Sequence, residues 1–382
     1  SMVSRCVERI RRRSVASAVA STGGQIMPPI MGAAAFLLAE NLGITYGEVA
    51  VKSAIIAVLY YFSLFAMIHF KCLKEDIRGE DKADLPDLKV ILKKSYLFIP
   101  IVLLLVLLIT GTSTLLSGLW ATVACIVVSM FSKETRMTPR KLINALYSGG
   151  KSSVMCMAAL GGAGIIVVAV TYSGLALSFS SLVVSLSHGI KFFALLLIAV
   201  ACMILGMGVP STAAYVIASA LGCRILLRLG VSPFAAHMFV FYFSIISNIT
   251  PPVAVAAYAA ANVAESNPMK TGVLASILAV VAYIVPFIAA YNPALLLEGT
   301  PVMIVQSTIT AFVGVYLIAA AIQGYFMGHL NLLKRLIVAC AAMGFMIVGT
   351  FTDVIGLIIL VAFVVYQKFI ANKKEPNIPA NA

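Results

Sequence analysis

Charged side chains are the first thing that this sequence lacks. Asp, Glu, Lys and Arg together make up 11% of its 382 residues, whereas hydrophobic residues make up 62%. Soluble domains carry about 25% charged residues, because their surfaces face water. With a mean hydropathy of +1.05, the chain has more apolar surface than a water-soluble core can bury. The composition therefore excludes a soluble protein and predicts a bundle of membrane-spanning helices.

Acidic residues are scarcer than basic ones. The sequence has 14 Asp and Glu against 27 Lys and Arg, which gives a formal net charge of +13. The basic residues fall in short loops between apolar segments, a distribution that marks the cytoplasmic side of membrane proteins. The charge therefore indicates a lipid bilayer as the partner and argues against nucleic acid.

Clustered metal ligands and familiar catalytic motifs are absent as well. The seven cysteines are scattered singly without a C-x-x-C pair, and the four histidines lie far apart, so neither a disulfide framework nor a zinc site is indicated. The sequence also has no H-E-x-x-H, no G-x-x-x-x-G-K-[ST] loop and no G-x-S-x-G elbow. These absences argue against an ATP-driven pump or a membrane hydrolase, and we predict that the protein is not an enzyme.

Proline and glycine are present where an apolar span would ordinarily carry leucine. Residues 206–215 read GMGVPSTAAY and residues 247–258 read SNITPPVAVAAY, each inside a hydrophobic stretch. Proline removes a backbone donor and clashes with the preceding turn, so the helix kinks or breaks. Inside a membrane the freed carbonyls are tolerated only where they face protein or a wet cavity. Two such breaks indicate the midplane substrate and ion site of a secondary transporter.

A third broken stretch, STGGQIMPPIMGAAAF, covers residues 21–36. Like residues 247–258, it has a serine-led polar turn, a double proline and small residues before an aromatic ring. We interpret the two stretches as an internal repeat. Gly208 precedes Pro251 by 43 residues, and the equivalent position before Pro28 would be −15. We therefore expect that the hairpin of the first repeat is missing and that this chain is the C-terminal part of a longer protein.

The same reading divides the chain into six parts. In order, we predict a basic cytoplasmic arm (1–20), the broken helix of the first repeat (21–48), spanning helices (49–190) with cytoplasmic loops at 71–95 and 132–151, a re-entrant hairpin and second broken helix that carry the ion and substrate site (191–265), C-terminal spanning helices (266–370) and a cytoplasmic tail (371–382). We also expect residues 96–116 and residues 271–290 each to form one continuous span.

Carboxylates are nearly absent from the predicted spans, and this bears on the coupling ion. A proton-driven carrier usually places Asp, Glu or His along its pathway, whereas the groups at the breaks are neutral. Such oxygens hold a hard monovalent cation, and half-helix C-termini add negative partial charge. Na+ therefore fits better than H+. The neutral groups in question are Ser211, Thr212, Asn248 and Thr250, with the carbonyls freed by Gly206, Gly208, Pro210, Pro251 and Pro252.

A half-helix that starts inside the membrane also offers a place for an anion. Its first N–H groups are free and carry positive partial charge, which attracts a carboxylate. Ser211 and Thr212 follow Pro210 at such a start, so these three are the candidate substrate-binding residues and an organic anion is the predicted cargo. The alternative, that the breaks are only kinks that relieve helix packing, stays open.

Three segments closely resemble the large membrane subunit of TRAP transporters, and most closely the TAXI-type permeases, in which small and large membrane subunits are often fused. The segments occur in the order typical of the family, and the resemblance extends from about residue 20 to residue 369. They are residues 21–36, residues 206–217 (GMGVPSTAAYVI) and residues 241–261 (FYFSIISNITPPVAVAAYAAA).

The resemblance implies an all-α polytopic membrane protein with an inverted-repeat, elevator-type ion transporter fold, built from re-entrant hairpins and broken helices. It implies Na+-coupled import of a small organic anion (a carboxylate) across a prokaryotic cytoplasmic (inner) membrane. A periplasmic substrate-binding protein would deliver the cargo, and a small TRAP membrane subunit or the missing N-terminal part would complete the assembly. Carried over by position, one Na+ site would use Gly206, Gly208, Asn248, Thr250 and Pro251, and half of another would use Ser21, Thr22, Gly23 and Gly24.

The chain departs from the family pattern before Ser21, where the first hairpin and the small-subunit region are expected. The first Na+ site would therefore be incomplete. Two alternatives follow: a non-transporting remnant of such a permease, or a passive ion channel that needs no binding protein and shows no saturable Na+-dependent uptake.

Overall fold

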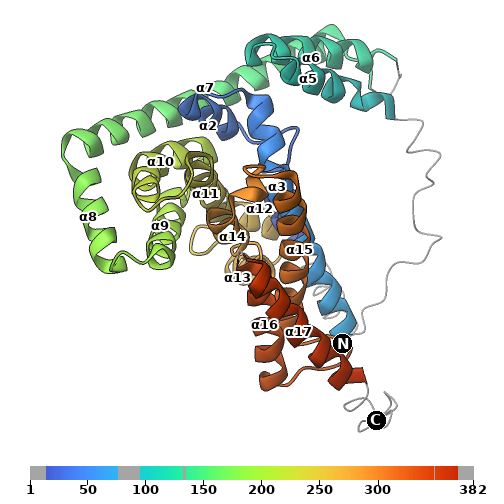
Figure 1. Cartoon of the computed structure of the whole chain (residues 1–382). Coiled ribbons are helices and arrows are strands. Elements are labelled where there is room, and N and C mark those ends of the chain that lie inside the picture. Colours follow the sequence, from blue (N-terminus) through green and yellow to red (C-terminus); the bar gives the residue numbers. More distant parts are fainter. Residues whose placement is uncertain (1–13, 76–94, 132–134, 348, 369–382) are drawn as a thin grey trace.

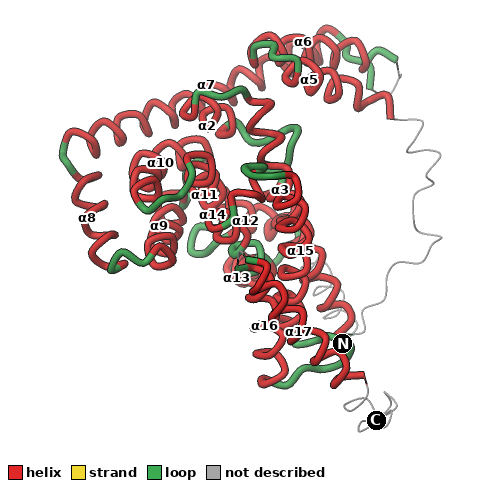
Figure 2. The backbone as a smooth tube through the Cα atoms, in the orientation of Figure 1, coloured by secondary structure: helices red, strands yellow, loops and turns green. Residues whose placement is uncertain are grey.

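The computed structural model describes residues 14–75, 95–131, 135–347 and 349–368, and these residues form helices joined by short loops without a β-strand (Figure 2). Three helices are long and apolar enough to cross a membrane: α3 (Tyr46–Lys74), α7 (Pro139–Tyr172) and α15 (Pro301–Gln323). Further apolar helices are shorter. The prediction of an all-α polytopic membrane protein is confirmed.

Several helices begin at the same two-residue signal, a capping side chain followed by proline. The capping oxygen accepts a hydrogen bond from the N–H group three residues later, and proline suits the first helical position because the N–H that it lacks would be unpaired there. The pairs are Thr138–Pro139 (α7), Ser232–Pro233 (α11, Pro233–Ile246), Asn267–Pro268 (α13, Pro268–Leu278) and Thr300–Pro301 (α15).

The centre of the molecule is a bundle of α9 (Lys191–Gly206), α10 (Ser211–Arg228) and α11, which pack against one another. The short helix α2 (Ala34–Leu42) rests on both α10 and α11, although more than 150 residues separate them in sequence. Aromatic rings fill the core, where Phe239 and Phe243 of α11 meet Phe287 of α14 (Val285–Tyr291) edge to face. The predicted hairpin (α9 and α10) and the second break, which follows α11, therefore lie in a well-packed part of the molecule.

A second group of helices extends away from this bundle (Figure 1). α15 packs on α3, α16 (Leu332–Met346) packs on α15, and α17 (Thr350–Tyr366) packs on α16. Gly344 and Gly356 allow α16 and α17 to approach closely, because a Cβ at Gly344 would lie 2.8 Å from the Cα of Gly356. Small residues at helix crossings are the usual means of packing helices in lipid.

The remaining helices form an arm. α5 (Ile99–Ile109) and α6 (Thr114–Ser129) pair as a hairpin at one end of α7, and α8 (Leu175–Ser187) descends from the other end (Figure 1). α7 has 34 residues, which makes it about 50 Å long at 1.5 Å per residue. Only 6% of its most apolar window is buried. Such an apolar, exposed helix is expected to face lipid or another membrane subunit.

Several predicted boundaries differ from the observed ones. Residues 96–116 do not form one span, because α5 ends at Ile109, Gly111 takes a left-handed conformation and Ser113 caps α6. Residues 271–290 are likewise interrupted, since α13 ends at Leu278 and α14 begins only at Val285. Both predictions of a continuous span were wrong.

Helix also extends into segments that we predicted to be loop or arm. The predicted loop 132–151 is helical from Pro139 onward, and residues 14–20 of the predicted arm belong to a helix over residues 14–23. In the predicted loop 132–151, the cause is the Thr138 cap with Pro139. These two residues start a helix whatever the charge of the residues that follow. Residues 1–13, most of the predicted loop 71–95 (residues 76–94) and the predicted tail 371–382 lie outside the described residues.

The two broken helices have the same plan. Helix 14–23 and α2 flank the first double proline, and α11 and α12 (Val255–Val263) flank the second. The Pro28–Pro29 and Pro251–Pro252 bonds are both cis. Pro251 follows Pro28 by 223 residues, and Tyr283 follows Tyr60 by the same 223 residues. The likeness between the stretches therefore continues past the double prolines, to a tyrosine in α3 and another in the turn between α13 and α14.

Candidate functional site

The hairpin tip joins α9 to α10. α9 ends at Gly206, Gly208 has φ +72°, and α10 starts at Ser211. Because Pro210 has no N–H, the Gly206 carbonyl four residues earlier cannot receive the usual helical hydrogen bond, and it accepts the Val209 N–H at 3.5 Å instead. No side chain caps the start of α10, so its first N–H groups are not satisfied by a cap. The predicted break is present, and it leaves the start of α10 without a side-chain cap.

The second break begins where α11 passes into the 3₁₀ turn η3 (Ser247–Ile249). Pro251 and Pro252 have no N–H, so the carbonyls of Ser247 and Asn248 cannot make their usual bonds to the residue four places on. The Ser247 carbonyl instead accepts the Thr250 N–H at 3.2 Å. The break therefore concentrates carbonyl and hydroxyl oxygens at half-buried positions of Asn248 and Thr250.

The tip and the second break are in direct contact. A Cβ on Gly206 would lie 2.4 Å from Ser247 Oγ, and a Cβ on Gly208 would lie 3.3 Å from Val253 Cγ1. Glycine is required at both positions, at Gly206 for the close approach and at Gly208 also for its positive φ. The structure thus places Gly206 and Gly208 against the segment that contains Asn248, Thr250 and Pro251, about 40 residues later in the chain, through contacts with Ser247 and Val253.

Thr212 stands out among the candidate substrate-binding residues. Its side chain is buried at the start of α10, and its Oγ1 makes no hydrogen bond. A buried hydroxyl without a partner costs about 1–3 kcal/mol, so native proteins rarely keep one. Gln367 Oε1 is the other buried side-chain atom without a partner among the described residues.

The first break is arranged differently. Ser21 Oγ and Thr22 Oγ1 both donate to the Ala18 carbonyl of their own helix, at 3.0 and 2.9 Å. Gly23 packs against the Tyr60 ring so closely that a Cβ there would lie 2.2 Å from Tyr60 Cε1, and Gly24 N–H donates to the Ser21 carbonyl. These residues lie together, and it is α3 rather than the hairpin tip that the described contacts place against them.

The breaks are held by side chains that the sequence patterns did not single out. Tyr60 and Tyr61 of α3 donate to the Val19 and Ala20 carbonyls, at 2.6 and 2.8 Å. At the second break, Ser276 Oγ of α13 donates to the Ile249 carbonyl at 3.1 Å, and Tyr283 Oη lies 2.8 Å from Thr250 Oγ1. The 223-residue spacing between the double prolines would have found Tyr60 and Tyr283, since it relates them to each other.

A family model described as "Tripartite ATP-independent periplasmic transporter, DctM component" matches residues 11–303. The chain belongs to this family. The match contains both breaks and the hairpin and ends near the start of α15, so α16 and α17 lie beyond it. No curated protein and no solved structure matches the chain at a significant level. The resemblance of the three sequence segments to the large TRAP subunit is thereby confirmed for this DctM chain at the level of the family.

A polar network ties α10 of this DctM chain to α2 and α11. Tyr215 of α10 lies one turn beyond Ser211, and its Oη is 2.8 Å from His237 Nδ1 of α11. Asn41 of α2 donates to the same Tyr215 oxygen at 3.4 Å. The hairpin is therefore bonded to both the first and the second broken helix beside the candidate site.

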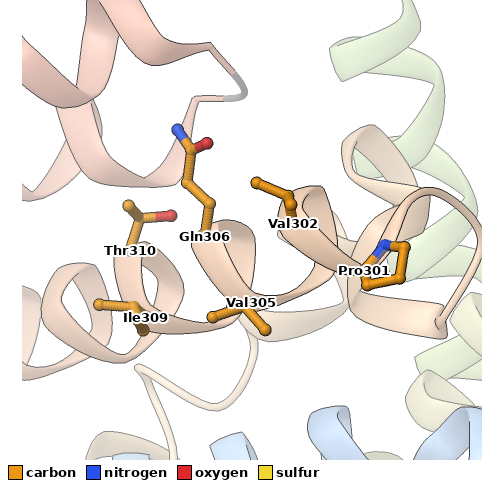
Figure 3. A pocket seen from close by; sticks show the side chains of 6 residues that line it. All are labelled: Pro301, Val302, Val305, Gln306, Ile309 and Thr310. Atoms are coloured by element: carbon orange, nitrogen blue, oxygen red, sulfur yellow. The ribbon is translucent and has the colours of Figure 1, made fainter.

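Open grooves of the molecule lie elsewhere. One, of about 550 Å³, runs along a face of α15 and is almost entirely apolar (Figure 3). Gln306 points from it toward α17, where its Nε2 donates to Asp353 Oδ2 at 2.8 Å. A second groove lies over Met269 and Val273 of α13. Because one helix alone lines each groove and no candidate site residue belongs to either, we assign them to the lipid-facing surface.

Proposed function

We propose that this DctM-family chain is the large membrane subunit of a secondary active transporter that couples Na+ to the import of small organic anions. Family membership makes it a membrane transport component. The observation that supports the finer proposal is the close contact of Gly206 with Ser247, because it brings the hairpin tip against the polar side chains of the second break.

The donor set fits Na+. The groups at the contact are hydroxyls, an amide and main-chain carbonyls, which are neutral oxygen ligands of the kind that hard monovalent cations take. Among the described residues there is no group of three His, Cys, Asp or Glu that could hold a metal ion, and a divalent cation would ordinarily need carboxylates. Gly206, Gly208, Asn248, Thr250 and Pro251 would hold the ion, which supplies positive charge beside the anionic cargo.

The start of α10 fits a carboxylate. Its N–H groups have no side-chain cap, the helix dipole adds positive partial charge there, and the Thr212 hydroxyl has no partner. A carboxylate oxygen could accept from Thr212 and from these N–H groups together. Ser211 and Thr212 would therefore bind the cargo, and Pro210 would keep the first turn of the helix open.

The family also implies a periplasmic binding protein and a small membrane subunit as partners. We propose that the binding protein delivers the anion to the hairpin side in a prokaryotic cytoplasmic membrane. The exposed arm of α5, α6 and α7 would then face lipid or the small subunit.

The test is uptake by the purified chain, with its membrane and periplasmic partners, in proteoliposomes. A panel of radiolabelled mono- and dicarboxylates is offered with an inward gradient of Na+ or of K+. Saturable uptake that requires Na+ and the binding protein is expected. Uptake that is linear with concentration and indifferent to both would identify a channel instead.

Two substitutions test the assignment of residues. Thr250→Val removes a neutral ligand oxygen, and Ser211→Ala removes a hydroxyl at the start of α10, while both keep the size of the side chain nearly unchanged. We expect each to weaken the Na+ dependence of uptake by about tenfold, in line with about 1–1.5 kcal/mol per interaction, without loss of membrane insertion. An unchanged Na+ dependence in both variants would remove these residues from the site.

A further inference from the structure

Three tyrosines lie between the two breaks. Tyr60 comes from α3, Tyr242 from α11 and Tyr283 from the turn between α13 and α14. The rings of Tyr60 and Tyr242 are 6.0 Å apart. Each hydroxyl has a partner of its own: Tyr60 donates to the Val19 carbonyl, Tyr242 to the Ala282 carbonyl, and Tyr283 meets Thr250.

The direction of the hydrogen bond between Tyr283 and Thr250 follows from counting protons. A threonine hydroxyl has one proton and two acceptor lone pairs. Thr250 Oγ1 is 2.9 Å from the Ile246 carbonyl, which can only accept, so the threonine proton is used there. With the threonine proton on Ile246, we assign Tyr283 as the donor across the 2.8 Å contact with Thr250 Oγ1, a contact in which either oxygen carries a proton to give; the Tyr283 hydroxyl also interacts with the Ser276 side chain. One lone pair of Thr250 is occupied by Tyr283, and the second remains for a cation.

These two bonds fix the Thr250 side chain in space. The bond to Ile246 runs back four residues to the last residue of α11, and by itself it holds only one direction. Tyr283 reaches Thr250 from a different element, 33 residues later in the chain. With both bonds made, the remaining lone pair has a single direction, whereas without Tyr283 the hydroxyl could turn its acceptor side elsewhere.

The first repeat carries the matching residue. Tyr60 occupies the position equivalent to Tyr283 in the 223-residue spacing. It too bonds to an oxygen of the broken helix of its own repeat, the Val19 carbonyl, and its ring packs on Gly23. A tyrosine that follows each break and bonds to its broken helix thus occurs in both repeats, although Val19 lies eight residues before Met27, the position equivalent to Thr250.

We propose that Tyr283 is a positioning residue, which donates to Thr250 and so directs the free lone pair of that hydroxyl toward a bound monovalent cation. This inference rests on the proposed function, since it assumes the Na+ site at the second break. Tyr283 itself does not contact the ion.

The experiment measures the Na+ concentration that gives half of the maximal thermal stabilisation of the purified chain in lipid nanodiscs, with K+ as the control cation. Binding to the folded state stabilises it by mass action, so this midpoint reports affinity without any transport. Tyr283→Phe is expected to raise the midpoint about three- to tenfold, the loss that corresponds to one hydrogen bond. Tyr242→Phe is the matched control, because it removes a fully buried hydroxyl of the same cluster that does not touch Thr250, and its midpoint should stay within about twofold of the wild type.

A double variant separates positioning from general loss of stability. If Tyr283 acts through Thr250, the variant Thr250→Val/Tyr283→Phe should have the same midpoint as Thr250→Val alone, because the hydroxyl that Tyr283 holds is already gone. Additive losses would overturn the proposal. An equal rise of the Na+ midpoint in Tyr242→Phe would overturn it as well, because the loss of any buried hydroxyl would then have the same effect.

A size-preserving change covers the case in which Tyr283→Phe does not fold. 3-Fluorotyrosine incorporated at position 283 makes the phenol a stronger donor, and it should move the Na+ midpoint by at least about twofold, whereas the same substitution at position 242 should not. If the wild-type chain shows no stabilisation by Na+ over K+, the proposed function fails. If the wild type responds to Na+ and both changes at position 283 leave the midpoint unaltered, only the role of Tyr283 fails.

Discussion

Gly206→Ala is the sharpest perturbation that the structure offers, because it acts on the contact between the hairpin tip and the broken helix. The added methyl group would lie 2.4 Å from Oγ and 2.9 Å from Cβ of Ser247, where ordinary contacts are 3.4 Å or longer. Ser247 is fully buried and its hydroxyl donates to the Ser244 carbonyl at 2.7 Å, so it has no room to turn aside. The hairpin and the broken helix must therefore separate by about 1 Å, since a close-packed interior does not absorb such an overlap.

The change in stability caused by Gly206→Ala has two opposing contributions. Overpacking of a well-packed contact costs about 1–3 kcal/mol, whereas replacement of glycine by alanine in a helix gains about 0.5–1 kcal/mol. We expect a net loss of stability of about 1–2 kcal/mol. The loss of Na+ binding should be larger in proportion, because binding sites tolerate displacements of only about 0.5 Å. The Na+-dependent gain in Tm should therefore nearly vanish.

The cysteines supply the assay. Cys202 of α9 and Cys223 of α10 are buried in the two arms of the hairpin, so they react with a fluorogenic maleimide only when the hairpin opens. Cys125 and Cys340 are exposed, and Cys72 and Cys156 are half-buried; we would replace these four, and Cys6, by serine to lower the background. Tm is then measured in Na+ and in K+ for each variant.

Two further variants control for the interpretation. Gly162→Ala introduces the same methyl group into α7, where nothing lies within 4 Å, and it should leave both Tm and the Na+ response unchanged or slightly improved. Ser247→Gly removes the atoms that the new methyl would strike, so Gly206→Ala/Ser247→Gly should recover most of the Na+ response. If Gly206→Ala keeps the wild-type Na+ response, the tip and the break do not form the ion site.

The remaining predictions concern hydroxyls and helix ends. Thr212→Val should raise Tm in the absence of cargo, because it removes a buried hydroxyl without a partner at a gain of up to about 1–3 kcal/mol, and calorimetry with the carboxylate panel should show weaker binding. Arg335→Met should lower stability by about 1.5–3 kcal/mol, since Arg335 donates to the last carbonyls of α15, yet the Na+ midpoint should not move. Tyr215→Phe breaks the contact with His237 and should cost about 1 kcal/mol equally in Na+ and K+, and a change in Tm that depended on the cation would contradict its structural role.

The breaks could be predicted from the sequence because their cause is local. Pro210 and the double prolines remove N–H groups wherever they occur in a helix, and Gly208 permits the positive φ that the tip requires. The helix start at Pro139 had an equally local signal in the Thr138 cap, but the basic residues around it favoured a loop reading, which was wrong. At this helix start, the capping residue and the proline predict the backbone conformation correctly, whereas the charge of the neighbouring residues does not.

The contacts that hold the breaks could not be predicted from local patterns. Tyr61 and Tyr283 lie 41 and 33 residues from the atoms that they bond, and neither stands in an unusual stretch. The interruption of the helix at residues 279–284 also goes with contacts between residues distant in sequence. There Tyr283 lies against Thr250, and the Ala282 carbonyl accepts a hydrogen bond from Tyr242. Only a comparison of the repeats, with the spacing carried past the double prolines, exposes these residues.

The balance of hydrogen bonds also bears on whether the breaks are kinks or a site. If the breaks were kinks that serve packing alone, their freed backbone groups should be paired within the protein. Much of the second break is paired in this way, since Ser276 donates to the Ile249 carbonyl and Tyr258 donates to the Pro252 carbonyl. The start of α10 does not, since it has no side-chain cap and Thr212 Oγ1 has no partner. Packing gives no reason to leave donors unpaired beside a break that is otherwise compensated. Binding of an anion there, with a cation beside it, does give one, and for this reason we favour a site over a kink.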